Sequence, residues 1–128
     1  MNKLLLDSWA LIEILGKGPN FSKVSQLMHG NQCFTTTLNL YEVYYHLKEE
    51  NGVEKAEEAA RIIAMNLTLL PIEARTAIDA ANMREFIKKG RSGIGAIDIL
   101  TYVTAQNIGA QLITGDSDFK GLKGVILL

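Results

Sequence analysis

The sequence predicts an α/β fold in which helices cover both faces of a parallel β-sheet. Short apolar runs that do not alternate with polar residues recur along the chain, as strands buried on both sides do. Longer stretches with helical periodicity separate these runs, which is the pattern of right-handed crossover connections between parallel strands.

Five short runs are predicted to be strands. They cover residues 4–6, 32–36, 67–72, 111–114 and 125–128. The first is a run of three leucines that Asp7 and Ser8 terminate, and the second is short and rich in β-forming residues. The fourth and fifth are brief apolar runs, and the segment 115–120 between them is predicted to be a loop or short turn.

Six stretches are predicted to be helices. They cover residues 9–15, 24–28, 40–47, 53–65, 74–88 and 96–107. Gly16, Gly30 and Gly109 follow the first, second and sixth of them, as helix-ending glycines do. The fourth is amphipathic, with its alanines and Ile63 on one face.

Polar residues are predicted to cap two of these helices. Asn20 or Ser22 would cap the second helix, and Thr37 or Asn39 would cap the third. A glycine-rich, basic loop over residues 90–95 is predicted between the last two helices.

The composition is that of a globular chain, and the 128 residues are expected to form one domain, residues 1–128. With 13 basic and 14 acidic residues, no basic excess indicates nucleic-acid binding. One cysteine and two histidines exclude an internal disulfide and a Cys- or His-rich metal site. No apolar run approaches the ~20 residues of a membrane span, and Asp7 comes too early for a signal peptide. A cytoplasmic protein with no membrane association is therefore expected.

Five acidic residues are predicted to converge on the carboxyl edge of the sheet, where parallel α/β folds bind ligands. Asp7 follows the first strand, and Asp116 and Asp118 follow the fourth, while Glu42 and Asp98 lie in helices that reach the same edge. Alone, Asp7 would be a helix cap, and Asp116 and Asp118 would be turn residues. Glu42 alone would be an exposed helix position, whereas Asp98 lies between apolar residues and needs a partner or a cation. Together the five acids would repel and raise each other's pKa. A divalent cation removes that repulsion, and oxygen ligands suit Mg²⁺ or Mn²⁺.

Basic residues flank the predicted acidic edge. If these five acids are set aside, the chain has nine other acidic residues and 13 basic residues. The basic residues nearest to Asp98 and Asp118 in sequence are Lys88, Lys89, Arg91, Lys120 and Lys123. An acidic pit with a basic rim would bind a polyanion, with Arg91 as a candidate substrate contact. The alternative is an ordinary solvated surface.

Four segments occur in an order that matches a known family. They are Leu5-Leu6-Asp7-Ser8, Leu40-Tyr41-Glu42-Val43, Ile97-Asp98-Ile99-Leu100 and Leu112-Ile113-Thr114-Gly115-Asp116-Ser117-Asp118-Phe119. On these segments the chain resembles the PIN-domain nucleases, and most closely their small VapC-type toxins. The resemblance extends over essentially the whole chain.

The resemblance implies a three-layer α/β/α sandwich and a Mg²⁺- or Mn²⁺-dependent endoribonuclease with an RNA substrate, a small antitoxin partner and a homodimeric state. It implies that the catalytic acids are Asp7, Glu42, Asp98 and Asp116, with Asp118 as an outer acid. Asp7, Asp98, Asp116 and Asp118 are the candidate metal ligands, and Glu42 would orient or deprotonate the attacking water. Ser8 and Thr114 would hydrogen-bond the carboxylates or a phosphate oxygen.

Some aromatic residues admit two interpretations. Trp9 stands where many family members have a smaller polar residue, so it would either narrow the site or face the core. Tyr41, Tyr44 and Tyr45 would stack on unpaired bases or, in the favoured interpretation, pack in the core or in a dimer.

Other folds and functions fit less well. A receiver domain requires a phosphoacceptor Asp after the third strand, which this chain lacks. A dehalogenase-like phosphatase requires an acid at the position that Trp9 occupies. A dinucleotide-binding domain requires a glycine-rich turn after the first strand, which is also missing. Two alternatives stay open: a PIN-like nuclease of RNA processing or decay that is not a toxin, and a catalytically silent module that binds RNA or a protein.

Overall fold

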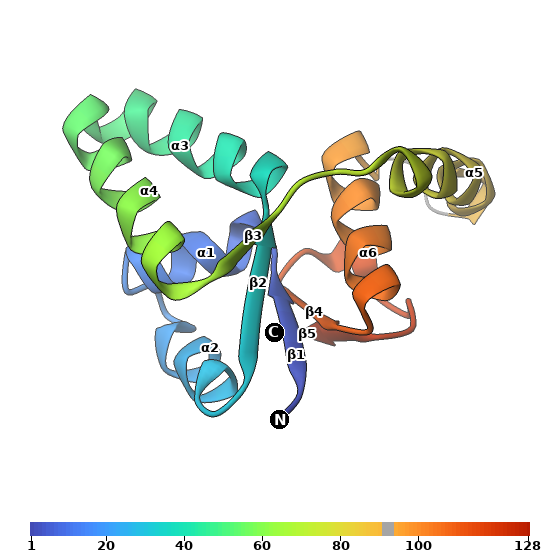
Figure 1. The fold of residues 1–128 in the computed structure, drawn as a ribbon, viewed down its shortest axis with the longest axis horizontal. Helices are drawn as coiled ribbons and strands as arrows, with labels where there is room; N and C mark the ends of the chain where they lie inside the picture. The colour runs from blue at the N-terminus through green and yellow to red at the C-terminus, as the bar shows by residue number, and fades with distance from the viewer. Residues whose placement is uncertain (91–93) are drawn as a thin grey trace.

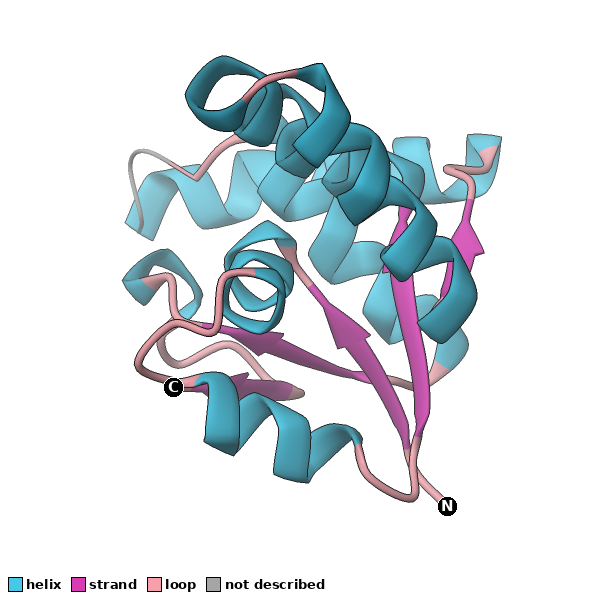
Figure 2. Ribbon diagram, turned by 90° about the vertical axis from the view of Figure 1, so that its left-hand side faces the viewer, coloured by secondary structure: helices cyan, strands magenta, loops and turns pink. Residues whose placement is uncertain are grey.

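The computed structural model describes residues 1–90 and 94–128. Within these ranges, five strands form one sheet with the order β3-β2-β1-β4-β5, and all neighbouring pairs are parallel. The strands are β1 (Lys3–Leu6), β2 (Gln32–Thr36), β3 (Thr68–Leu70), β4 (Gln111–Thr114) and β5 (Val125–Leu127). They fan out across the sheet, as the natural twist of β-strands requires (Figure 2).

Helices connect the strands. In the described ranges they are α1 (Ser8–Leu15), α2 (Phe21–Met28), α3 (Thr37–Asn51), α4 (Val53–Asn66), α5 (Ala74–Gly90) and α6 (Ala96–Ile108), with a 3₁₀ turn, η1 (Ser117–Phe119). The first four lie on one side of the sheet, and α5 and α6 lie on the other (Figure 1). The expected three-layer α/β/α architecture is confirmed.

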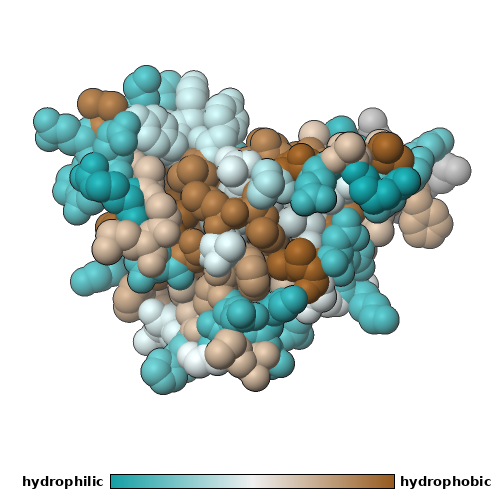
Figure 3. Space-filling model, viewed as in Figure 1, coloured by the Kyte–Doolittle hydropathy of each residue, from teal (hydrophilic) through white to brown (hydrophobic). Residues whose placement is uncertain are grey.

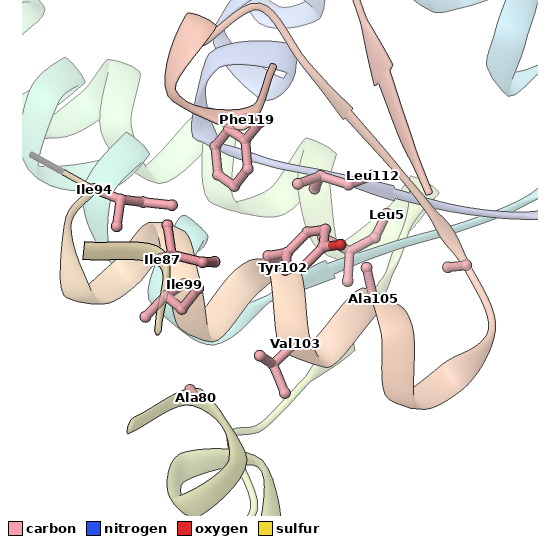
Figure 4. Close-up of a cluster of buried hydrophobic side chains, with 11 residues drawn as sticks. Leu5, Ala80, Ile87, Ile94, Ile99, Tyr102, Val103, Ala105, Leu112 and Phe119 are labelled. Carbon is pink, nitrogen blue, oxygen red and sulfur yellow. The ribbon is translucent and has the colours of Figure 1, made fainter. Parts of the chain in front are cut away.

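Each face of the sheet has its own buried core, because successive strand residues point to opposite faces. Leu4 and Leu6 of β1 contribute to the core beneath α1–α4, together with Val24 and Val43. Leu5 contributes to the core beneath α6, with residues such as Ile99, Tyr102 and Phe119 (Figure 4). The absence of alternation in these strands therefore reflects burial on both faces.

The observed boundaries differ from the predicted ones where capping decides them. Thr36, and neither of the predicted residues, caps α3 by accepting a hydrogen bond from the backbone of Asn39. Asn20 is the N-cap residue of α2, but its side chain accepts no hydrogen bond from the helix. Its amide instead donates to Glu13. The strand predicted at residues 67–72 is shorter because Leu67 ends α4 and Pro71 has no N–H to donate.

Apolar residues also reach the surface. They gather in the middle of the face shown in Figure 3, between the two groups of helices. Exposed apolar side chains include Met65 of α4 and Phe86 of α5. Over the described part of the chain, no helix is both long and apolar enough to cross a membrane.

Candidate active site

Asp7 lies at the carboxyl end of β1, where the strand order reverses between β1 and β4. Parallel α/β sheets form a ligand-binding crevice at such a point. The Asp7 side chain caps α1 by accepting a 2.9 Å hydrogen bond from the N–H of Ala10, and the Thr114 hydroxyl also contacts it. Asp7 is almost fully buried, with only 4% of its surface exposed. Burial, followed by the charges of Asp98 and Asp116, raises the pKa of Asp7 to about 7 against the effect of these donors. A cap alone does not require so buried a carboxylate.

Asp98 reaches the same crevice from the first turn of α6, whose N-cap is Gly95. Burial raises the pKa of Asp98 to about 6, and the charges of Asp116, Glu42 and Asp118 act in the same direction. A hydrogen bond from the Gly95 backbone opposes this shift. The charges of these neighbouring acids therefore add to the effect of burial at Asp98.

Asp116 and Asp118 lie in the turn after β4. The Asp116 N–H donates to the Thr114 hydroxyl at 3.0 Å, and the Asp116 carboxylate accepts from the Asp118 N–H at 2.9 Å. Phe119, the next residue, is completely buried and lies 6.3 Å from Tyr102, ring centroid to ring centroid. The core beneath α6 thus anchors the turn that holds the two acids (Figure 4).

The structure brings the sequence-predicted acids together. One carboxylate oxygen from each of Asp98, Asp116 and Asp118 lies within 4.8 Å of the others. Asp7 interacts electrostatically with Asp98 and Asp116, and Glu42 interacts with Asp98. Asp118, expected as an outer acid, belongs to this group of three.

Hydrogen bonds hold Glu42 on the α3 side of the crevice. The Ser8 hydroxyl donates to Glu42 Oε1 at 2.5 Å, and Asn39 Nδ2 donates to Ser8 Oγ at 3.0 Å. Ser8 therefore contacts a carboxylate, as one of its expected roles requires. Asn39 was not predicted to lie near the site, although its position one helical turn before Glu42 is a signal for it.

Trp9 lies against the turn that holds Asp116. A Cβ atom on Gly115 would come within 2.2 Å of Cε2 of Trp9, so the indole covers the glycine directly. The same side chain packs against the core beneath α1–α4. Trp9 therefore faces the core, as favoured for a lone tryptophan, and also borders the turn.

The structure places the other residues expected near the acids in different positions. Arg91 lies outside the described residues, while Lys120 and Lys123 are exposed. Tyr41 and Tyr45 are 61% and 57% exposed, so the core interpretation is wrong for both. Their ring centroids lie 6.5 Å apart on the surface of α3.

The donor set fits a hard divalent cation. The acids offer only carboxylate oxygens, the ligands that Mg²⁺ and Mn²⁺ prefer. The raised pKa values of Asp7 and Asp98 show that the protein alone does not compensate the ionised forms. Asp98, Asp116 and Asp118 lie close enough to share one ion, with Asp7 adjacent.

Several solved structures share this fold. They include DNA-bound VapBC from Salmonella typhimurium (TM-score 0.80, 18% identity, covering 100% of this chain and 98% of that chain). VapBC2 from Rickettsia felis, bound to a promoter DNA fragment, has a TM-score of 0.79 and 20% identity and covers 98% and 97%. VapC20 from Mycobacterium tuberculosis, described as a sarcin-ricin loop cleaving toxin, has a TM-score of 0.76 and 15% identity and covers 95% and 96%. Comparison with curated proteins gives no match.

The sequence itself identifies the family. Residues 4–125 match the family model of the PIN domain. The match includes all five acids of the crevice, and the structural neighbours have the same fold, as the resemblance implied. The chain therefore belongs to the PIN domain family.

Proposed function

We propose that this chain is a divalent-metal-dependent endoribonuclease and the toxin of a toxin–antitoxin pair. The observation that carries the proposal is the convergence of five carboxylates at the crevice between β1 and β4, two of them with raised pKa values. A binding module gains nothing from carboxylates that repel each other, whereas a metal-dependent nuclease uses them to hold its cation. Membership of the PIN family supports the same function.

We assign the metal ligands to Asp98, Asp116, Asp118 and Asp7. When bound, Mg²⁺ or Mn²⁺ supplies positive charge for the phosphodiester and makes a water molecule more acidic. Thr114 positions two of these ligands, since its hydroxyl contacts the Asp7 carboxylate and accepts from the Asp116 backbone.

Glu42 has the geometry of a general base. Its carboxylate is held by Ser8 and lies at the rim of the acidic group. Glu42 would accept a proton from the attacking water, whose oxygen forms a bond to phosphorus while the bond to one bridging oxygen breaks. The leaving oxygen then takes a proton from solvent.

We propose that an antitoxin segment covers an apolar groove between α1, α2 and α4. The groove has a volume of about 480 Å³ and is lined by residues that include Leu11, Leu15, Met28 and Ile62. A toxin–antitoxin complex from Klebsiella pneumoniae is among the structural neighbours and supports such a partner. A homodimer is part of the same proposal, and light scattering of the purified protein tests it.

The first experiment incubates purified protein with total cellular RNA and Mg²⁺ or Mn²⁺, and maps new 5′ ends by sequencing. Discrete new ends are expected that disappear with a chelator and with the Asp98→Asn protein. Asp79→Asn, which changes a half-buried acid of α5 that pairs with Arg75, is the matched control and should cleave normally.

Ends that persist in the Asp98→Asn sample would indicate a contaminating nuclease. The absence of cleavage together with the absence of measurable Mn²⁺ binding would overturn the proposal in favour of a silent binding module.

A further inference from the structure

Asn39 is a buried amide next to the acidic crevice. It lies in the first turn of α3 and is 1% exposed. A buried amide is costly unless its donors and acceptor are satisfied. Its Oδ1 accepts from the Thr36 hydroxyl at 2.8 Å, and its Nδ2 donates to Ser8 Oγ at 3.0 Å. Its backbone N–H donates to Thr36 Oγ1 at 3.1 Å, so both the main chain and the side chain of Asn39 are fixed.

The direction of these hydrogen bonds determines where the Ser8 proton points. A serine hydroxyl has a single proton to donate. Because Asn39 Nδ2 is itself a donor, Ser8 Oγ accepts from it and keeps its own proton for Glu42 Oε1, 2.5 Å away. If an acceptor faced Ser8 instead, the serine proton would turn away from Glu42.

Asn39 also connects the elements that carry the acids. Ser8 begins α1, directly after Asp7, and Glu42 lies one turn further along α3. On α6, the Thr101 hydroxyl lies 3.2 Å from Asn39 Oδ1, although its shorter bond, 2.7 Å, is to the Ile97 carbonyl of its own helix. Asn39 therefore has a stronger effect on the orientation of Ser8 than on the position of α6.

We propose that Asn39 is a positioning residue that acts on Glu42 through Ser8. By donating to Ser8, it directs the serine hydroxyl to Glu42 and keeps that carboxylate oriented at the acidic edge. This inference rests on the proposed function for its effect on cleavage, but the hydrogen-bond relay can be tested without any substrate.

The test is a double-mutant cycle of Asn39→Leu, which keeps the side-chain shape, and Ser8→Ala. Cleavage is measured on the RNA fragment identified by end mapping. Each single variant should lower kcat by about tenfold and leave KM within about twofold, because orientation of a base affects the chemical step. The double variant should be no slower than the slower single variant, since both changes break one relay. Reductions that multiply would overturn the proposal, as would a wild-type kcat in folded Asn39→Leu protein.

Two measurements distinguish positioning from a general structural role. Mn²⁺ affinity of Asn39→Leu should match the wild type, whereas a large loss would show that Asn39 supports Asp98 instead and would overturn the proposal. Thr101→Val, which leaves the bond between Asn39 and Ser8 intact, should retain kcat. If Asn39→Leu does not fold, Asn39→Asp keeps the shape but presents an acceptor to Ser8, and the same loss of kcat is expected.

An NMR measurement keeps the relay testable if the protein cleaves no RNA. In the ¹⁵N-labelled protein, Ser8→Ala should move one Asn39 side-chain amide proton upfield, because that proton loses its acceptor. An unchanged Asn39 amide signal would overturn the relay. The absence of cleavage with a shifted amide signal would instead contradict only the proposed function.

Discussion

The two sides of the acidic crevice are built differently. On the α3 side, the Glu42 carboxylate receives a hydrogen bond from Ser8, which Asn39 orients in turn. On the side of α6 and the β4 turn, carboxylate oxygens of Asp98 and Asp116 approach within 4.8 Å. There, burial and neighbouring charges raise the pKa of Asp98.

This difference separates two tasks. The Ser8 hydroxyl holds Glu42, the proposed general base, in one orientation. The crowded carboxylates also accept hydrogen bonds, but at Asp7 and Asp98 burial and neighbouring charges outweigh these donors and raise the pKa. A nearby cation would favour the ionised carboxylates. Folding alone therefore completes the α3 side, whereas on the other side the ionised forms of Asp7 and Asp98 are disfavoured without the proposed cation.

Asp98→Asn is expected to have the largest effect. The substitution removes one charge from the crowded side, so cleavage should fall by at least about 10³-fold, as for loss of a metal ligand in a hydrolytic site. The folded protein should be at least as stable as the wild type in chelator, because repulsion and a buried charge are relieved. Cleavage assays and thermal unfolding measure the two effects. A variant that cleaves at the wild-type rate would contradict the assignment of Asp98.

Sequence reasoning located this crowded side because strand ends follow simple rules. Apolar runs identified β1 and β4, and the acids that follow parallel strands must meet at one edge. The outer position expected for Asp118 came from the family resemblance, because sequence order does not reveal how a 3₁₀ turn places side chains. The 4.8 Å grouping depends both on that turn and on the packing of α6, which carries Asp98.

The contacts that support the acids were not predictable in the same way. Asn39 and Ser8 are 31 residues apart, and their contact depends on the packing of α1 against α3. The close approach of Trp9 to Gly115 likewise depends on how α1 lies beside β4. Hydrophobic periodicity and capping residues predict each helix or strand separately. These contacts depend instead on how the helices and strands pack against one another.

The pH dependence of stability is the next largest effect. In chelator, the pKa of Asp7 is raised to about 7 and that of Asp98 to about 6, so the folded protein binds more protons than the unfolded chain. Their contribution to stability is complete below the ordinary carboxyl pKa and is lost as the pH rises through 6 and 7. Between pH 5 and pH 8 the free energy of unfolding should fall by about 3 kcal/mol, most of it from the buried Asp7, because solvent screens the half-buried Asp98. Urea unfolding at each pH measures it.

Added Mg²⁺ should remove most of this loss, because the cation stabilises the ionised carboxylates. Asp7→Asn should flatten the pH dependence in chelator. A free energy of unfolding that rises over this pH range in chelator would show that the ionised forms of Asp7 and Asp98 are not disfavoured.

Gly115→Ala should have a smaller effect and act on the crowded side alone. The new methyl group would meet the Trp9 indole at 2.2 Å, so the turn or the indole must move. We expect a loss of about 2 kcal/mol in stability, typical of overpacking, and weaker Mn²⁺ binding because Asp116 follows directly. The Trp9→Ala background should tolerate the alanine. Equal losses in both backgrounds would exclude the contact with Trp9 as the cause.

The smallest expected effect is spectroscopic, and it asks whether the crowded side changes when a cation binds. Trp9 is the single tryptophan of the chain, and it covers Gly115, next to Asp116. Paramagnetic Mn²⁺ at the acidic group should therefore quench Trp9 emission in a saturable manner, and Asp98→Asn should weaken the response. Asn39→Leu should leave it unchanged, since Asn39 serves the α3 side. Quenching that survives the loss of Asp98 would place the ion elsewhere, whereas a response that depends equally on Asn39 and Asp98 would mean that the two sides act as a single unit.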